Sequence, residues 1–182
     1  MKTRHARPMA PWLSGMFAVW FAHVAAAGSA PTTGERSILR PTDSIDYLSF
    51  SGGYVGVFRD TVGAAFSVQY LFHENFHGVH PEFLLGATSH SQYLNLTLLY
   101  SLPLRGRWFC NISTGPGLYR RDDRGDDLGT AVEFLSGISV GRSIGRGQLI
   151  SLGISHISNA HLGSKNHGNE LVRLIYSLPV SR

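Results

Sequence analysis

Three residues near the C-terminus have the types and the spacing of a hydrolytic site. His156, Ser158 and Glu170 lie within a stretch of fifteen residues. An imidazole that accepts the serine proton makes the hydroxyl a nucleophile, and a carboxylate on the other ring nitrogen fixes the tautomer and stabilises the imidazolium. Asn159 and Ala160 follow directly, and an amide side chain or backbone N–H groups there could stabilise an oxyanion. These residues predict ester cleavage by a Ser-His-Glu triad.

The chain that must position these residues alternates between apolar and polar side chains. A period of two over about ten residues is the signal of a β-strand, because successive side chains point to opposite faces. Four segments show it clearly: 92–102, 130–142, 148–158 and 170–180. Four others show it more weakly: 45–57, 62–72, 79–88 and 107–120. In the first of these the alternation is broken around Gly52 and Gly53, where we expect a β-bulge.

The eight segments predict an all-β fold, an eight-stranded antiparallel transmembrane β-barrel. Each segment has the length that a tilted strand needs to cross a bilayer, and eight is the smallest strand number of bacterial barrels. One face is rich in Leu, Val, Ile and Phe, whereas the other is small or polar. Charged residues make up only 15% of the chain, which is low for a soluble secreted domain. The alternative is a soluble β-sandwich or lipocalin-like barrel.

The N-terminus has the three parts of a secretory signal. Lys2, Arg4 and Arg7 precede an apolar stretch over 12–24, and small residues follow. We therefore expect a cleaved signal peptide at 1–27, with cleavage after Ala27 or, alternatively, Ala30. The rest, 28–182, is expected to be a single barrel domain with an extended lead-in at 28–44.

Composition narrows the function classes. After residue 27 no run of about 20 apolar residues occurs, which excludes a membrane helix and leaves the closed β-barrel as the spanning structure. Cys110 is the single cysteine, so an internal disulfide and a thiolate zinc cluster are excluded. Without the three basic residues of the signal, 13 basic residues stand against 12 acidic ones, so no nucleic-acid partner is indicated.

Strand parity places the triad on the apolar face of the predicted barrel. His156 and Ser158 share parity with Ile150, Leu152 and Ile154, and Glu170 shares parity with the apolar set of the last strand. Antiparallel pairing of these two strands would bring Glu170 beside His156. The longest connections between segments follow the fifth and the seventh segment. We therefore expect the end of the barrel that carries His156 and Ser158 to lie at the extracellular rim. The alternative is that His156 and Ser158 are ordinary polar residues near the headgroups.

The stretch from His156 to Glu170 resembles the signature of the lipid A 3-O-deacylase (PagL) family. The matching residues are His156, Ser158, Asn159, Ala160, Asn166, Gly168 and Glu170. The resemblance implies an eight-stranded outer-membrane serine esterase that removes the acyl chain ester-linked at the 3-position of lipid A. Ser158 would be the nucleophile, His156 the general base and then acid, and Glu170 the orienting carboxylate. Asn159 would belong to the oxyanion site, and His161 stands where the family often has Gly.

The resemblance also implies lipopolysaccharide in the outer leaflet as the substrate and no metal or organic cofactor. It leaves open whether the chain forms a homodimer. Two other functions remain alternatives: a non-enzymatic barrel for adhesion or envelope integrity, and an esterase that acts on phospholipids.

Polar residues outside the triad have simpler interpretations. We expect His73, His77, His80 and Glu82 to be solvated turn residues and not metal ligands. Glu133 and Arg173 have the parity of the barrel interior and should belong to a polar network there. The run 120–124 of Arg and Asp is expected to be a solvated outer loop.

Overall fold

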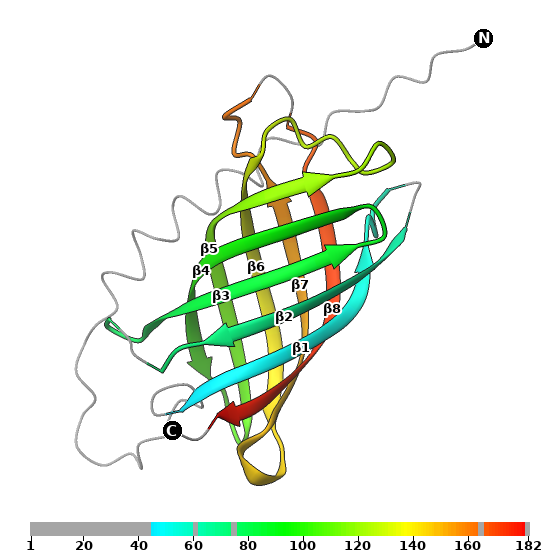
Figure 1. The fold of residues 1–182 in the computed structure, drawn as a ribbon. Coiled ribbons are helices and arrows are strands. Elements are labelled where there is room, and N and C mark those ends of the chain that lie inside the picture. Colours follow the sequence, from blue (N-terminus) through cyan, green and yellow to red (C-terminus); the bar gives the residue numbers. More distant parts are fainter. Residues whose placement is uncertain (1–44, 60–61, 74–75, 164–165, 181–182) are drawn as a thin grey trace. The chain divides into compact units, whose positions relative to one another are not determined.

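The computed structural model describes residues 45–59, 62–73, 76–163 and 166–180 (Figure 1). The predicted signal peptide and lead-in, 1–44, lie outside the described residues. Eight strands form a closed antiparallel barrel in which each strand pairs with its neighbours in sequence and the last pairs with the first. They are β1 (Asp46–Val55), β2 (Gly63–Leu71), β3 (Val79–Thr88), β4 (Ser91–Pro103), β5 (Trp108–Arg121), β6 (Val132–Ser143), β7 (Leu149–Ser158) and β8 (Asn169–Val180).

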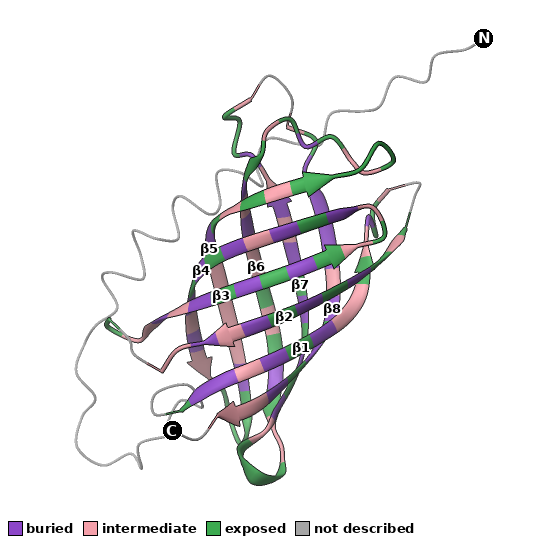
Figure 2. Ribbon diagram, viewed as in Figure 1, coloured by how far each residue is buried: buried purple, intermediate pink, exposed green. Residues whose placement is uncertain are grey.

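The predicted eight-stranded barrel is confirmed, and each predicted segment overlaps one strand. Burial alternates along the strands because successive side chains point into the barrel and away from it (Figure 2). In β7 the odd residues from Leu149 to Ile157 are buried, whereas Ile150, Leu152 and Ile154 are exposed. The apolar parity of the sequence is therefore the outward face.

The bulge expected at Gly52 and Gly53 is absent. β1 pairs with β2 and with β8 in uninterrupted register through both glycines. A Cβ atom on Gly53 would lie 1.9 Å from the backbone oxygen of Val172. The glycine is needed because the β8 backbone approaches closely here, which breaks the sequence alternation without inserting a residue.

The two ends of the barrel differ in their connections. β7–β8 and β5–β6 are joined at one end by the links 159–168 and 122–131, with β1–β2 joined there by 56–62. The fourth link at this end, 89–90 between β3 and β4, has only two residues. The links at the other end are 72–78, 104–107 and 144–148, each shorter than 122–131 and 159–168, and the last contains the 3₁₀ turn η1 (Gly145–Gly147). Among the described residues, no helix has the length and apolar character required to cross a membrane.

The barrel interior contains both apolar and polar side chains. One hydrophobic cluster includes Leu84, Leu135 and Leu171, and a second includes Phe109 and Leu149. Many of the other buried side chains are polar.

Arg173 of β8 donates from Nη1 to Ser67 Oγ at 3.0 Å and from Nη2 to Ser155 Oγ at 2.9 Å. Glu133 is fully buried and accepts a hydrogen bond from Thr130 Oγ1 at 3.3 Å. The predicted interior positions of Glu133 and Arg173 are confirmed.

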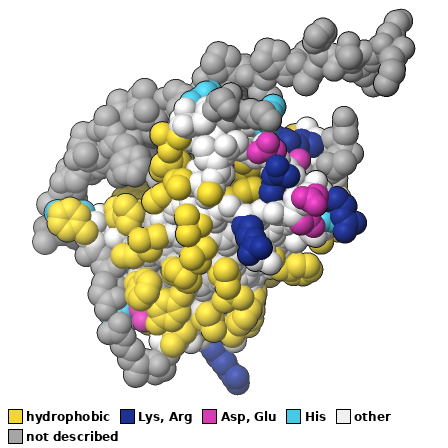
Figure 3. Space-filling view, turned by 45° about the horizontal axis from the view of Figure 1, so that its top comes forward, with side chains coloured by type: hydrophobic (Ala, Val, Ile, Leu, Met, Phe, Trp, Pro, Cys, Tyr) yellow, Lys and Arg dark blue, Asp and Glu magenta, His cyan; other side chains and the backbone are white. Residues whose placement is uncertain are grey.

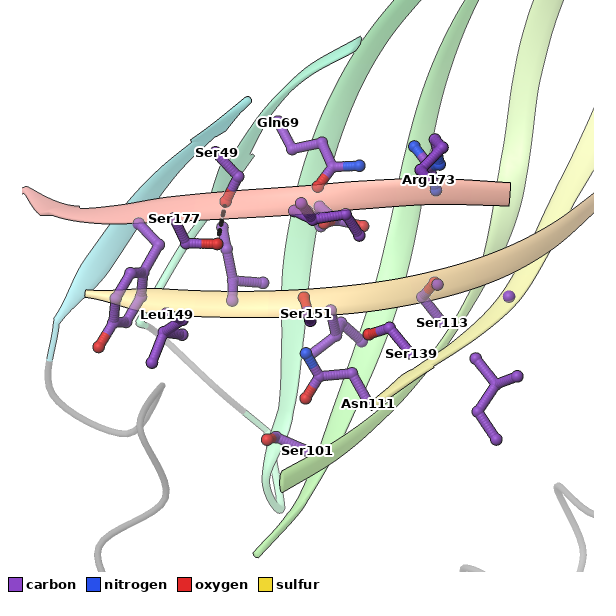
Figure 4. Close-up of a pocket in the computed structure, with 18 of the residues that line it drawn as sticks. Ser49, Gln69, Ser101, Asn111, Ser113, Ser139, Leu149, Ser151, Arg173 and Ser177 are labelled. Atoms are coloured by element: carbon purple, nitrogen blue, oxygen red, sulfur yellow. Dashed lines mark hydrogen bonds between the residues drawn. The ribbon is translucent and has the colours of Figure 1, made fainter. Parts of the chain in front are cut away.

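The space left inside is small. The lumen contains a cavity of about 50 Å³, lined by Ser, Gln, Asn and Arg173 side chains and by apolar side chains such as Leu71, Phe109 and Leu149 (Figure 4). This volume holds a few water molecules. Ser49 and Ser177 both line this cavity, and Ser49 Oγ donates to Ser177 Oγ at 2.8 Å. A cavity of this size does not hold an acyl chain.

The outer wall is apolar over most of its area. Large hydrophobic side chains such as Phe66, Leu85, Leu96 and Leu152 are more than half exposed there. On the face shown in Figure 3, hydrophobic side chains gather together and most charged side chains gather separately. This separation is what a barrel wall in contact with lipid requires.

Candidate active site on the outer wall

His156 and Glu170 face each other across β7 and β8. They are register partners in the antiparallel pair, and His156 Nδ1 lies 3.3 Å from Glu170 Oε1. The imidazole is 44% exposed and the carboxylate only 10%. Because Nδ1 meets the carboxylate, Nε2 is the ring nitrogen left to exchange protons with another group.

Ser158 lies two residues beyond His156 on the same outward face. It is the last residue of β7 and is partly exposed. Its register partner on β6 is Phe134, also outward-facing. The structure therefore places hydroxyl, imidazole and carboxylate on one side of the barrel wall, as parity predicted.

Gly168 closes the site on the side of the β7–β8 loop. Its φ is +46°, in the left-handed region that favours glycine. A Cβ atom at this position would lie 2.4 Å from His156 Cε1 and 2.7 Å from Nε2. The backbone of the loop thus packs directly against the imidazole, and no larger residue leaves room for the ring in this position.

The Asn159 side chain points away from the triad. It is fully buried, its Nδ2 donates to the backbone oxygen of Leu128 at 2.9 Å, and its Oδ1 accepts from the backbone N–H of His161 at 2.9 Å. A buried amide with these partners does not reach a lipid ester on the outer wall. Asn159 therefore holds the turn that follows Ser158, and its side chain does not suit the oxyanion role expected from the sequence.

The turn after Ser158 is tight and left-handed. Ala160 and His161 have φ values of 51° and 65°, and the backbone N–H of Leu162 donates to Asn159 O at 2.9 Å. This is the geometry in which glycine is usual. The backbone N–H of His161 is already bonded to Asn159 Oδ1, so it is not available to an oxyanion. Ala160 is exposed, and no residue in the described ranges accepts a hydrogen bond from its N–H.

Two charged residues from other loops support the segment behind His156. Arg59 of the β1–β2 loop donates from Nη2 to the backbone oxygens of His167 and Gly168, and its Nη1 lies 3.5 Å from Asp126 Oδ1. Asp126 also accepts from Asn169 Nδ2. Sequence reasoning missed Arg59 and Asp126. They lie far from the triad in the chain, and nothing in their local pattern distinguishes them from solvated loop residues.

The histidines at the other end of the barrel have structural partners. His73 Nδ1 lies 2.6 Å from Asp46 Oδ1, and Tyr70 donates to the second oxygen of Asp46 at 2.7 Å. His80 and Glu82 are buried in β3, where Glu82 accepts a hydrogen bond from Thr97 Oγ1 at 2.6 Å, so their interpretation as solvated turn residues was wrong. Both occupy inward-facing positions of β3. Within the described ranges, no group of three or more His, Cys, Asp or Glu side chains could hold a metal ion.

Comparisons with known proteins agree with the barrel fold and identify a family. The family model described as lipid A 3-O-deacylase (PagL) matches residues 61–179. The solved structure of the outer membrane enzyme PagL is similar at a TM-score of 0.56 and 20% identity, covering 74% of this chain and 99% of that one. Neisserial surface protein A is similar at a TM-score of 0.59 and 9% identity, covering 74% and 97%. At these identities the solved structures show the fold alone. No curated protein matched the chain.

Proposed function

Because this chain belongs to the lipid A 3-O-deacylase (PagL) family and is therefore an outer-membrane ester hydrolase, we propose that Ser158, His156 and Glu170 are its catalytic triad. The reaction removes the acyl chain that is ester-linked at the 3-position of lipid A. The observation that carries the proposal is the 3.3 Å contact between His156 Nδ1 and Glu170 Oε1, on the same outward face as Ser158.

In the first half of the reaction, Ser158 Oγ attacks the ester carbonyl carbon while His156 Nε2 takes the hydroxyl proton. The tetrahedral intermediate collapses by breaking the bond between the carbonyl carbon and the sugar oxygen. His156 then gives its proton to this leaving oxygen, and the acyl chain stays on Ser158. Glu170 keeps Nδ1 protonated and stabilises the imidazolium in both steps.

In the second half, water attacks the acyl-serine ester while His156 Nε2 accepts a water proton. Collapse breaks the bond to Ser158 Oγ, which regains its proton from His156. The products are a free fatty acid and lipid A with a 3-hydroxyl group. The backbone N–H of Ala160 is our candidate donor to the oxyanion in both halves, because it is exposed next to Ser158 and has no acceptor in the described structure.

The substrate reaches this site laterally, from the outer leaflet. The triad faces outward, and the lumen cavity of about 50 Å³ is too small for an acyl chain. In this proposal the end of the barrel with the long 122–131 and 159–168 links faces outside the cell, as in outer-membrane barrels generally. The ester at the boundary between headgroup and acyl chain then meets Ser158 without leaving the membrane.

The test is mass spectrometry of lipid A from cells that express the wild-type protein or Ser158→Ala. We expect the wild type to remove one ester-linked acyl chain and the variant to lose roughly 10³-fold or more in rate. Ser151→Ala is the matched control, because Ser151 lies on the same strand but faces the lumen. It should retain full activity.

Insertion is checked by the different gel mobility of the folded and heat-unfolded barrel. If Ser158→Ala folds and still deacylates lipid A at the wild-type rate, the triad assignment is wrong. If the wild type leaves lipid A unchanged but releases fatty acid from phospholipids, the substrate assignment is wrong.

A further inference from the structure

Five polar side chains on the outer wall lie together around the proposed triad. Most described residues that face outward from the eight strands are apolar, glycine or tyrosine. Polar residues of other types occur at only a few outward positions. Four of these lie within two residues of a strand end and apart from the triad: Asp46, Gln92, Arg120 and Arg142. The others are Thr114, Ser136, His156, Ser158 and Glu170. Thr114 and Ser136 therefore belong to the same polar area as the triad, although neither has a part in the reaction.

Strand register aligns these residues in a single row. Ser136 of β6 is the partner of His156, and Thr114 of β5 is the partner of Ser136. With Glu170 as the partner of His156 on β8, the row runs across four neighbouring strands. A row of polar groups this long on a lipid-facing wall needs polar partners, because a polar group without a hydrogen-bond partner is costly in lipid.

The next row toward the middle of the strands is entirely aliphatic. Ile112, Ile138, Ile154 and Val172 are successive register partners on β5, β6, β7 and β8. The wall therefore changes from polar to aliphatic within one pair of residues along each of these strands. Ser158 lies one outward position nearer the strand end than this polar row, in register with Phe134. A lipid whose ester lies at Ser158 would therefore meet the row of Thr114 and Ser136 next to the ester, before its acyl chain reaches the aliphatic row.

The two hydroxyls leave one hydrogen without an acceptor. Thr114 Oγ1 and Ser136 Oγ lie 2.7 Å apart, so one hydroxyl donates to the other. Each hydroxyl has one donor hydrogen, and the second hydrogen of the pair must find its acceptor elsewhere. Neither hydroxyl has another hydrogen-bond partner in the described part of the chain. Both side chains are partly exposed and face outward, so the acceptor must come from outside the protein.

We propose that Thr114 and Ser136 form a subsite that binds a hydroxyl or carbonyl oxygen of the lipid substrate beside the scissile ester. The inference rests on the proposed function of the triad. The subsite binds an oxygen next to the ester so that the ester lies at Ser158, and it takes no part in proton transfer. The acceptor oxygen has two sources, the 3-hydroxyl of a 3-hydroxyacyl chain or an oxygen carried by the sugar.

The test uses purified full-length protein in detergent and two synthetic acylated glucosamine substrates, one with a 3-hydroxyacyl ester and one with the same chain lacking the hydroxyl. The variants are Thr114→Val, Ser136→Ala and the double variant. A lost hydrogen bond that is made equally in the ground state and the transition state raises KM without lowering kcat. We expect the double variant to raise KM by about 5- to 10-fold with kcat within about twofold of wild type.

The two substrates distinguish the source of the oxygen. A rise in KM for the 3-hydroxyacyl substrate alone assigns the acyl hydroxyl, and an equal rise for both assigns the sugar. Ser49→Ala is the matched control, because it removes one member of a hydroxyl pair that faces the lumen. It should leave both constants unchanged.

An unchanged KM in the folded double variant overturns the subsite. A fall in kcat at constant KM overturns it too, since the hydroxyls would then act through His156. Failure of the subsite and failure of the triad give different results. The triad is wrong if Ser158→Ala retains activity, whereas the subsite is judged only by the KM of the double variant.

Discussion

Gly168 lies directly against the imidazole of His156. Its absent Cβ would fall 2.4 Å from Cε1 of the ring, and its φ of +46° is one that L side chains rarely adopt. Glu170 contacts the same ring through Nδ1. The imidazole is thus set from two directions, by a carboxylate and by a loop backbone that approaches as closely as only glycine permits.

Gly168→Ala should displace the imidazole and strongly reduce deacylation. The new methyl group cannot occupy its position without moving the ring or the loop, and small misplacements of a catalytic group cost about 10²-fold in rate. The measurement is kcat for lipid A in detergent. Gly106→Ala is the control, because Gly106 also has a positive φ, +77°, but a Cβ there meets nothing within 4 Å. Equal losses in the two variants would mean that backbone strain alone is responsible.

Arg59→Ala should lower kcat by about 10-fold and leave the barrel folded. The guanidinium holds the backbone oxygens of His167 and Gly168, so its loss frees the segment that packs on His156. Arg59→Lys should have a rate between those of Arg59→Ala and the wild type. A lysine amine can still donate to a backbone oxygen, but it lacks the planar guanidinium with its several donors.

Arg121→Ala is the matched control for Arg59. Arg121 lies at the same end of the barrel, contacts Asp127 at 3.7 Å and donates to two loop carbonyl oxygens, but none of its partners touches His156. Its kcat should stay within about twofold of wild type. A similar loss in both arginine variants would assign the effect to general loop stability.

His161→Gly should leave the activity nearly unchanged. His161 adopts φ 65°, a conformation that glycine reaches without strain, and its N–H already bonds to Asn159 Oδ1. The substitution should therefore preserve the turn, and kcat/KM should lie within about twofold of wild type. A change of 10-fold or more would show that the imidazole or the N–H of His161 contacts the substrate.

Arg173→Met should destabilise the barrel without affecting the triad. The side chain bonds to Ser67 and Ser155 inside the lumen, and hydrogen bonds to a charged group contribute about 1.5–3 kcal/mol each. We expect a lower urea midpoint for unfolding in detergent and a wild-type kcat under native conditions. A loss of kcat in the folded variant would indicate coupling between the interior network and the outer wall.

The alternation of side chains determined the barrel and the outward direction of the triad. Alternation is a local property of the chain, so residues such as Ile154, His156 and Ser158 could be assigned to one face before any pairing was known. Pairing of adjacent strands then brought Glu170 to His156. Two predictions from the sequence were wrong because their causes are not local. The interruption at Gly53 is not a bulge but makes room for the β8 backbone, and His80 is not solvated because it lies on the inward face of β3.

The tertiary structure alone decided how the triad is supported. Arg59 contacts the backbone of Gly168 across 109 positions of sequence, and the Asn159 side chain turns inward because Leu128 of another loop accepts its hydrogen bond. The row from Thr114 to Glu170 likewise exists only because four strands adopt one register. Such contacts depend on where separate loops and strands meet in the closed barrel. The sequence therefore indicated the groups that we propose for the chemistry, and the closed barrel decided which groups hold them in place.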